Sequence, residues 1–330
     1  MERKFKTNTT TLLKRQLKQI SNQKEIAMIK RIDLRIRDPY IVAKDGKYYL
    51  YKSLNLEKPE RVVVHVSEDL ENWSEEKTVY TFPEDSWKDA EIWAPEVHEY
   101  LGKFYIFLSI KGKNGLRGTE ISVSDTPDGI FTPIANRPAT PLDKSCIDGT
   151  LFVDGDTPYI IYSRDWPNNF IKEKGVYVGQ IWGQELSKDL TTPVGEPFLM
   201  FESNECPYSL ERPATGIWED KPMVRYGSDA PFINRLSNGK LFLTWSPYPN
   251  NNYVILGAVA DGIKGKWKHI DKPLYDNNGG HAMFFTTFDG KRKVCMHQPE
   301  AWMKERALIL DVIEKDGELV IVNREERNDK

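Results

Sequence analysis

Short apolar or alternating stretches dominate the chain from Ile36 onward, and helical periodicity is absent there. The stretch that follows Asp38 shows the pattern: a short apolar run, the pair Asp45-Gly46, and an aromatic return run. Alternation and short apolar runs predict strands, and Asp-Gly, Asn-Gly and Leu-Gly pairs predict the tight turns of hairpins. This part of the chain is therefore expected to be all-β.

The hairpin pattern recurs, which indicates a repeat architecture. The five hairpin units span residues 37–51, 94–107, 147–162, 228–245 and 280–297. Each interval holds further strand-like runs, such as residues 62–67, 120–124, 176–180 and 254–259. Four strands per unit and five units predict a five-bladed β-propeller, with residues 201–226 as a loop insertion that could wall a pocket.

The N-terminal part of the chain has a different pattern. Residues from about 8 to 30 carry a rough apolar face at helical spacing after a polar run that can cap a helix. We expect a short N-terminal helical extension over residues 1–32 and a propeller domain over residues 33–330.

The composition limits the classes of binding partner that the chain is expected to have. The chain has 330 residues, 46 Lys and Arg against 49 Asp and Glu, nine Trp and fifteen Tyr. This charge balance gives no reason to expect nucleic acid or a membrane surface as a partner. Three cysteines, Cys146, Cys206 and Cys295, lack metal-type spacing and are expected to be reduced. The absence of a signal-like N-terminus predicts a cytoplasmic protein; removal of a leader would instead make it periplasmic or secreted.

One chemically active residue begins the inner strand of each unit. These anchors are Asp38, Glu96, Asp148, Asp229 and His281. In a propeller the first strands of all blades line one channel, so we expect the five side chains to converge at its mouth. Neighbouring carboxylates raise one another's pKa, and a protonated acid beside an ionised base is what glycoside hydrolysis requires. For each anchor alone, a turn-capping role is the alternative.

The anchor segments resemble glycoside hydrolase family 43. The resemblance rests on Arg-Asp-Pro-Tyr-Ile, Trp-Ala-Pro-Glu-Val, Ile-Asp-Gly-Thr-Leu-Phe and Ser-Asp-Ala-Pro-Phe, in that order within residues 33–325. It implies a five-bladed propeller that acts on arabinose- and xylose-containing glycans with inversion. It also implies that Asp38 is the general base and that Asp148 tunes the acid and orients the sugar.

The resemblance leaves the general acid open. The family usually has Glu where this chain has Asp229, which is one methylene shorter, and Glu96 is the rival. His281 resembles a residue that binds a metal ion or water beneath the sugar, with a satisfied channel histidine as the alternative. No cofactor is expected to be required, although Ca²⁺ could occupy the channel. An oligosaccharide or polysaccharide is the expected partner, and the sequence predicts no oligomeric state.

Aromatic residues are candidates for sugar binding because a ring face can stack on the C–H face of a sugar. Trp93, beside Glu96, is the first candidate, followed by Trp166 and Trp245, for which packing is the alternative. Three functions remain in view: an arabinofuranosidase or xylosidase, a carbohydrate-binding propeller without catalysis, and a protein-interaction propeller. A galactosidase-type specificity also stays open, because loops decide specificity.

Overall fold

Five four-stranded antiparallel sheets make up most of the computed structural model, which describes residues 28–54 and 60–322. The first sheet contains β2 (Tyr40–Lys44), β3 (Lys47–Leu54), β4 (Arg61–Ser67) and β6 (Lys77–Thr81). The second contains β7 (Lys88–Tyr100), β8 (Lys103–Gly112), β9 (Arg117–Ser124) and β10 (Thr132–Pro133). The third contains β11 (Cys146–Asp154), β12 (Thr157–Arg164), β15 (Gln180–Leu186) and β16 (Pro193–Glu202).

The last two sheets complete the set. The fourth contains β19 (Asp229–Arg235), β20 (Leu241–Ser246), β21 (Leu256–Ala260) and β22 (Lys268–His269). The fifth contains β23 (Gly280–Thr286), β24 (Arg292–Gln298), β25 (Arg306–Lys315) and β26 (Glu318–Val322). In every sheet the strand that comes first in the sequence lies at one edge, and the other strands follow outward in order.

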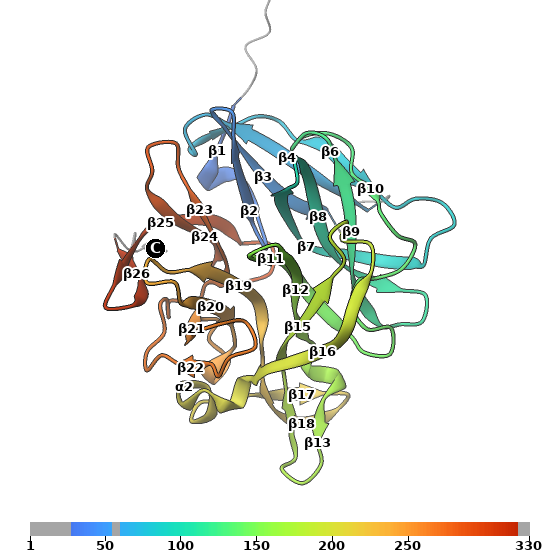
Figure 1. Ribbon diagram of the computed structural model, residues 1–330. Helices are drawn as coiled ribbons and strands as arrows, with labels where there is room; N and C mark the ends of the chain where they lie inside the picture. Colours follow the sequence, from blue (N-terminus) through green and yellow to red (C-terminus); the bar gives the residue numbers. More distant parts are fainter. Residues whose placement is uncertain (1–27, 55–59, 323–330) are drawn as a thin grey trace, which may run out of the picture.

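The five sheets are the blades of a closed ring. The first strands β2, β7, β11, β19 and β23 contact one another in this order, and β23 contacts β2. Figure 1 shows the same order, with the blue first blade between the teal second blade and the red fifth blade. The predicted five-bladed β-propeller is therefore confirmed.

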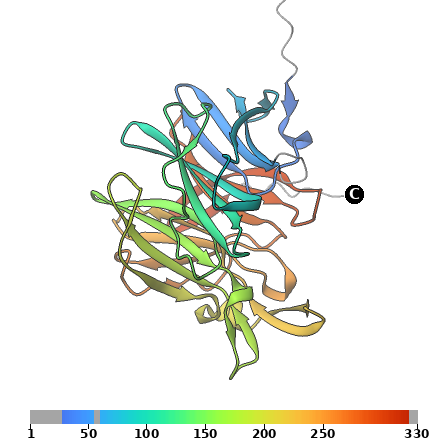
Figure 2. The same cartoon turned by 90° about the vertical axis from the view of Figure 1, so that its right-hand side faces the viewer.

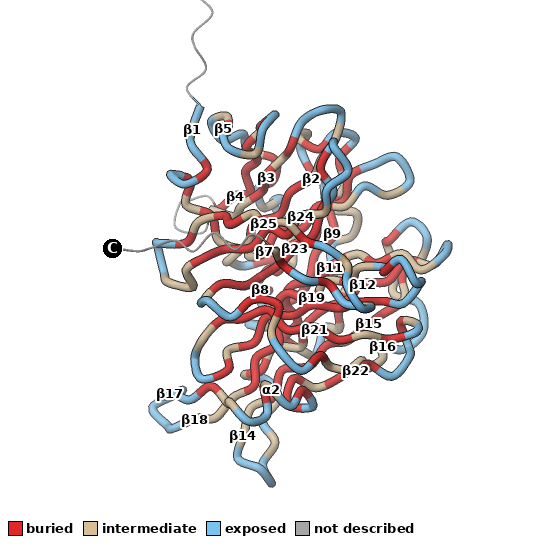
Figure 3. Tube along the Cα trace, turned by 90° about the vertical axis from the view of Figure 1, so that its left-hand side faces the viewer, coloured by how far each residue is buried: buried red, intermediate tan, exposed pale blue. Residues whose placement is uncertain are grey.

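Hairpin turns have the geometry that their sequences predict. Asp45 and Gly46 both adopt positive φ, 49° and 78°, as a two-residue type I′ turn requires. Apolar side chains from neighbouring blades form the core between them; one cluster joins Leu50 of the first blade, Ile106 of the second and Met283 of the fifth. In Figure 3 the buried positions follow the strands and the exposed positions follow the loops.

One additional sheet lies outside the blades. It consists of β13 (Phe170–Ile171), β14 (Val176–Val178), β18 (Lys221–Tyr226) and β17 (Ala214–Trp218). The hairpin of β17 and β18 projects from one edge of the molecule (Figures 2 and 3). The prediction that residues 176–180 form a blade strand was wrong for β14, because β14 pairs in parallel with β18, far away in the sequence. Residues 201–226 likewise form more than a loop.

Short elements complete the described chain. These are β1 (Ile29–Lys30), β5 (Asn72–Trp73), the 3₁₀ turns η1 (Arg31–Asp33), η2 (Trp166–Asn168), η3 (Ser203–Glu205) and η4 (Pro249–Asn251), and the helix α2 (Pro207–Leu210). The predicted N-terminal helix lies almost wholly outside the described residues, and its last two residues form β1, which pairs with β5. Within the described ranges, the helices are too short and too polar to cross a membrane.

Candidate active site

One residue of each inner strand region is left-handed; it lies at or near the start of the strand in four blades and in the middle of β7 in the second blade. Asp38, Ala94, Asp148, Ala230 and His281 have φ between 46° and 56°. In blades two to five this residue lies in a β-bulge against the second strand. Bulges re-aim side chains and occur beside active sites, and left-handed backbone costs energy for residues other than glycine. The five blades therefore present equivalent strained positions to the channel mouth.

The positions of the bulges show that the five anchors are not all structurally equivalent. Asp38, Asp148 and His281 occupy the left-handed position, as the repeat predicts. In the second and fourth blades that position is Ala94 and Ala230, so Glu96 lies two residues after it and Asp229 one residue before it. The prediction of five equivalent anchors was therefore wrong for these two carboxylates, which reach the channel from different places in the bulge.

A cleft of about 770 Å³ opens at the channel mouth. Its lining contains most of the predicted site residues: Asp38, Asp148, Asp229, His281 and Trp93. Glu96 is not in the lining, and only 4% of its surface is exposed. The structure thus brings four anchors to one cleft and places the fifth beneath its surface.

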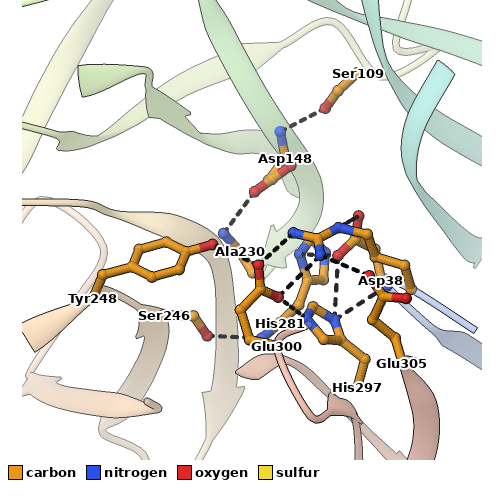
Figure 4. A network of polar contacts seen from close by, with 11 residues as sticks. Asp38, Ser109, Asp148, Ala230, Ser246, Tyr248, His281, His297, Glu300 and Glu305 are labelled. Atoms are coloured by element: carbon orange, nitrogen blue, oxygen red, sulfur yellow. Dashed lines mark hydrogen bonds and ion pairs between the residues drawn. The ribbon is translucent and has the colours of Figure 1, made fainter. Parts of the chain in front are cut away.

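Two imidazole rings and one guanidinium surround the carboxylate of Asp38 (Figure 4). Its Oδ1 lies 3.1 Å from Nδ1 of His281 and 3.4 Å from Nδ1 of His297, and its Oδ2 lies 3.8 Å from Nε of Arg37. Burial alone would raise the pKa of Asp38, but His281, Arg37 and His297 outweigh it and hold that pKa well below its usual range. Asp38 is therefore ionised at neutral pH.

Glu300, which also lines the cleft, holds this arrangement in place, and sequence reasoning missed it. Its two carboxylate oxygens each accept a hydrogen bond of 3.0 Å from Arg37, and its Oε2 lies 2.6 Å from Nε2 of His297. Burial lowers the pKa of His297, but its hydrogen-bonded contacts with Asp38 and Glu300 raise that pKa by more than burial lowers it. The net shift of the His297 pKa is therefore upward. Two carboxylates thus hold one imidazole ring and one guanidinium in place (Figure 4).

Asp148 and Asp229 have the opposite electrostatic environment. Burial raises the pKa of both carboxyl groups; the charge of Asp38 adds to the effect at Asp148, and the charges of Asp148 and Asp165 add to it at Asp229. Oδ2 of Asp148 accepts a 2.9 Å hydrogen bond from the backbone of Ala230, which fixes it beside Asp229. The cleft therefore combines an ionised carboxylate with carboxyl groups that favour the protonated form.

Glu96 also favours its protonated form. Burial raises its pKa from the ordinary value of 4.5 to about 8, although hydrogen bonding to Thr150 opposes the shift. Its Oε2 lies 3.5 Å from Nε2 of His98, and burial lowers the pKa of His98 to about 3. Glu96 is thus a neutral acid beside a neutral imidazole at pH 7, below the cleft.

The three predicted sugar-binding tryptophans have different positions. Trp93 lines the cleft, but the guanidinium carbon of Arg117 lies 3.2 Å from its ring centroid, so one face is covered. Trp166 is buried against Trp218 beside the additional sheet and is not in the cleft lining. Trp245 is wholly buried in the core, where packing is its role and no face is open to a sugar.

The surroundings of His281 bear on its predicted metal role. Its Nδ1 faces Asp38, and its backbone N–H donates a 2.9 Å hydrogen bond to Ser246. Across residues 28–54 and 60–322, no group of three or more His, Cys, Asp and Glu side chains is placed to hold a metal ion. These donors do not form a protein-ligated metal site, and a channel Ca²⁺ stays a prediction.

Comparison with known proteins gives the family. The model of "Glycosyl hydrolases family 43" matches residues 32–317, which is most of the chain. The chain belongs to glycoside hydrolase family 43. The propeller and the carboxylate-lined cleft therefore occur in a family defined by hydrolysis of glycosidic bonds.

Solved structures agree with this membership of family 43. The endo-arabinase from Bacteroides thetaiotaomicron VPI-5482 is 34% identical, with a TM-score of 0.78 over 88% of this chain and 98% of that chain. A thermostable family-43 glycoside hydrolase is 27% identical, with a TM-score of 0.75 over 88% of this chain and 93% of that chain.

Curated relatives are more distant. The "Xylosidase/arabinosidase" of Bacteroides ovatus is 26% identical and aligns over 86% of this chain and 94% of its own length. The "Alpha-L-arabinofuranosidase 43" of Humicola insolens is 21% identical over 80% of this chain. The chain spans about half the length of that relative and of one further arabinofuranosidase.

Proposed function

We propose that this chain is an inverting glycoside hydrolase that removes arabinofuranosyl or xylosyl units from plant-type polysaccharides or oligosaccharides. One observation carries the proposal: a single cleft holds the ionised Asp38 together with Asp148 and Asp229, whose pKa values are raised. Opposed pKa shifts in neighbouring carboxyl groups are typical of an acid and base pair. The names of the relatives, arabinofuranosidase, xylosidase and endo-arabinase, support the sugar class.

The proposed reaction uses the two kinds of carboxyl group separately. Asp38 accepts a proton from a water molecule as that water attacks the anomeric carbon. Asp229 donates its proton to the glycosidic oxygen as the bond to the leaving sugar breaks. Asp148, fixed by the backbone of Ala230, keeps the pKa of Asp229 raised and orients the sugar. Attack from the face opposite the leaving group inverts the anomeric centre.

The choice of Asp229 over Glu96 as the acid rests on access. Asp229 lines the cleft, whereas Glu96 is buried beneath it. A general acid must come within hydrogen-bond distance of the leaving oxygen, and a group outside the cleft lining cannot do so without rearrangement. Glu96 then acts as a neutral neighbour of the site.

One feature favours a second function, a sugar-binding propeller without turnover. Asp229 stands where family 43 usually has the longer Glu, so its proton has less reach. This alternative predicts that sugars bind in the cleft and are released unchanged.

Hydrolysis of aryl glycosides tests the proposal. The wild-type chain is offered aryl α-L-arabinofuranoside, β-D-xyloside and β-D-galactoside, and release of the phenol is followed. We expect turnover of an arabinoside or xyloside and a loss of about 10²–10⁴-fold in Asp38→Ala. Binding of the sugar without turnover would support the alternative. Hydrolysis by Asp38→Ala at the wild-type rate would refute the assigned base.

A further inference from the structure

Trp302 is a large aromatic residue at the mouth of the cleft that the proposed reaction does not use. It is 62% exposed, although most tryptophans are largely buried, and it lines the same cleft as Asp38. It lies between β24 and β25, two residues after Glu300, which is paired with Arg37. The loop that carries the indole is therefore anchored to the residue next to Asp38.

A guanidinium supports the indole from one side. The guanidinium carbon of Arg35 lies 5.1 Å from the ring centroid of Trp302, within the range of a cation–π contact. Nε of Arg35 also lies 3.5 Å from Oε2 of Glu305, which is wholly buried. Arg35 thus lies over the ring of Trp302, and 62% of this residue remains exposed at the cleft.

Trp93 has the same arrangement on another blade. Arg117 covers one face of Trp93 and pairs with Glu91, as Arg35 covers Trp302 and pairs with Glu305. Trp93 belongs to the second blade and Trp302 to the fifth, and both blades adjoin the first blade, which carries Asp38. The cleft thus has an arginine-backed tryptophan on each side of Asp38, which one sugar unit would not require.

Charge in the outer part of the cleft favours a neutral ligand. Lys52 and Glu76 lie 3.7 Å apart, and Arg35 is directed to Glu305. Glu91 is likewise paired with Arg117. Since these charges are already matched within the protein, a carboxylated sugar would find its most suitable cations occupied.

We propose that Trp302 is the stacking platform for a neutral sugar next to the one held over Asp38 and Asp148, so that the cleft binds at least two sugar units. The apolar C–H face of a sugar packs on the exposed part of the indole, and the hydroxyl groups remain in water. This inference rests on the proposed function and adds a specificity-determining residue to it.

Substrate length provides the test. Wild type, Trp302→Ala and Trp302→Phe are compared on a methyl glycoside, which places one sugar in the cleft, and on the corresponding neutral trisaccharide. We expect kcat/KM of Trp302→Ala to fall about tenfold on the trisaccharide, mainly through KM, which corresponds to about 1.4 kcal/mol. The methyl glycoside should change less than twofold, and Trp302→Phe should retain most of the activity.

Phe288→Ala is the matched control, because Phe288 is 52% exposed, packs on Tyr48 and is not in the cleft lining. It should leave both substrates unchanged. An equal loss of activity on both substrates in Trp302→Ala, or no loss on the trisaccharide, would overturn the platform. Tighter binding of a trisaccharide with a uronic acid as its outer sugar would overturn the neutral-sugar assignment.

Calorimetry keeps this inference separate from the proposed function. Affinities for the trisaccharide and for the free pentose are measured in Asp38→Asn and in Asp38→Asn combined with Trp302→Ala. A loss of affinity confined to the trisaccharide supports Trp302 as the platform, whether or not wild type hydrolyses any substrate. Absence of hydrolysis by wild type would reject only the proposed function. Equal affinities in the two proteins would reject the platform alone.

Discussion

Replacing Glu96 by Gln tests the electrostatics of the site through stability. In the folded chain burial raises the pKa of Glu96 to about 8, against an ordinary value of 4.5. The folded-state pKa is the higher one, so the stability contribution of this group is fully present below pH 4.5 and is lost as pH rises toward 8. Gln is neutral at every pH and has nearly the same shape.

The size of the effect follows from these pKa values. One pKa unit corresponds to about 1.36 kcal/mol, and about two and a half units separate pH 7 from the ordinary pKa. Between pH 4.5 and pH 7, Glu96 should therefore lower the free energy of unfolding of wild type by about 3 kcal/mol, and Glu96→Gln should not show this decrease. The variant should match wild type near pH 4.5 and become more stable than wild type as pH rises.

Urea unfolding at several pH values between 4.5 and 8 measures this difference. Glu99→Gln, the same exchange at an exposed position of β7, should stay within about 0.5 kcal/mol of wild type at each pH. A Glu96→Gln variant that is no more stable than wild type at pH 7 would mean that Glu96 is ionised in the folded chain. Activity should fall by less than about tenfold; a loss of about 10²–10⁴-fold would make Glu96 the general acid.

Two other predictions concern a buried ion pair between β7 and β9 and the electrostatic environment of Asp229. Lys88 and Glu120 form an ion pair with side chains 1% and 0% exposed, so Lys88→Met should destabilise the chain by about 3–5 kcal/mol in urea unfolding, and an unchanged midpoint would contradict the pairing. The charge of Arg225 opposes the rise in the pKa of Asp229, so Arg225→Met should move the basic limb of the kcat/KM profile to higher pH. A shift to lower pH would contradict Asp229 as the acid.

Local patterns predicted most of the propeller because its signals are short in range. Turn pairs such as Asp45-Gly46 and alternating runs fix hairpins without knowledge of distant residues. The additional sheet could not be found in this way, because β14 pairs with β18 across more than forty residues. The N-terminal helix and the division at residue 33 stay predictions.

The candidate site was predictable where the repeat is regular and not where bulges change the register. Asp38, Asp148 and His281 hold equivalent backbone positions, so aligning the repeats found them. The repeat predicted that Glu96 would lie in the cleft. That prediction failed because a bulge shifts the residues within a strand and redirects their side chains, and such a shift leaves no trace in the sequence pattern.

The supporting residues had weaker signals. His297 contacts Asp38 and Glu300 contacts Arg37, each across about 260 residues of sequence, and position in the chain gives no hint of these contacts. The only local hint was that His297 ends the return strand of the fifth unit.

The stereochemistry of the product tests the central claim most directly. The claim is that Asp38 activates water on one face of the sugar while Asp229 protonates the leaving oxygen on the other. Proton NMR of the first product, recorded before the anomers equilibrate, should show the β anomer from an α-arabinofuranoside or the α anomer from a β-xyloside. A first product with retained configuration would contradict the account, because it would require a carboxylate that attacks the sugar itself.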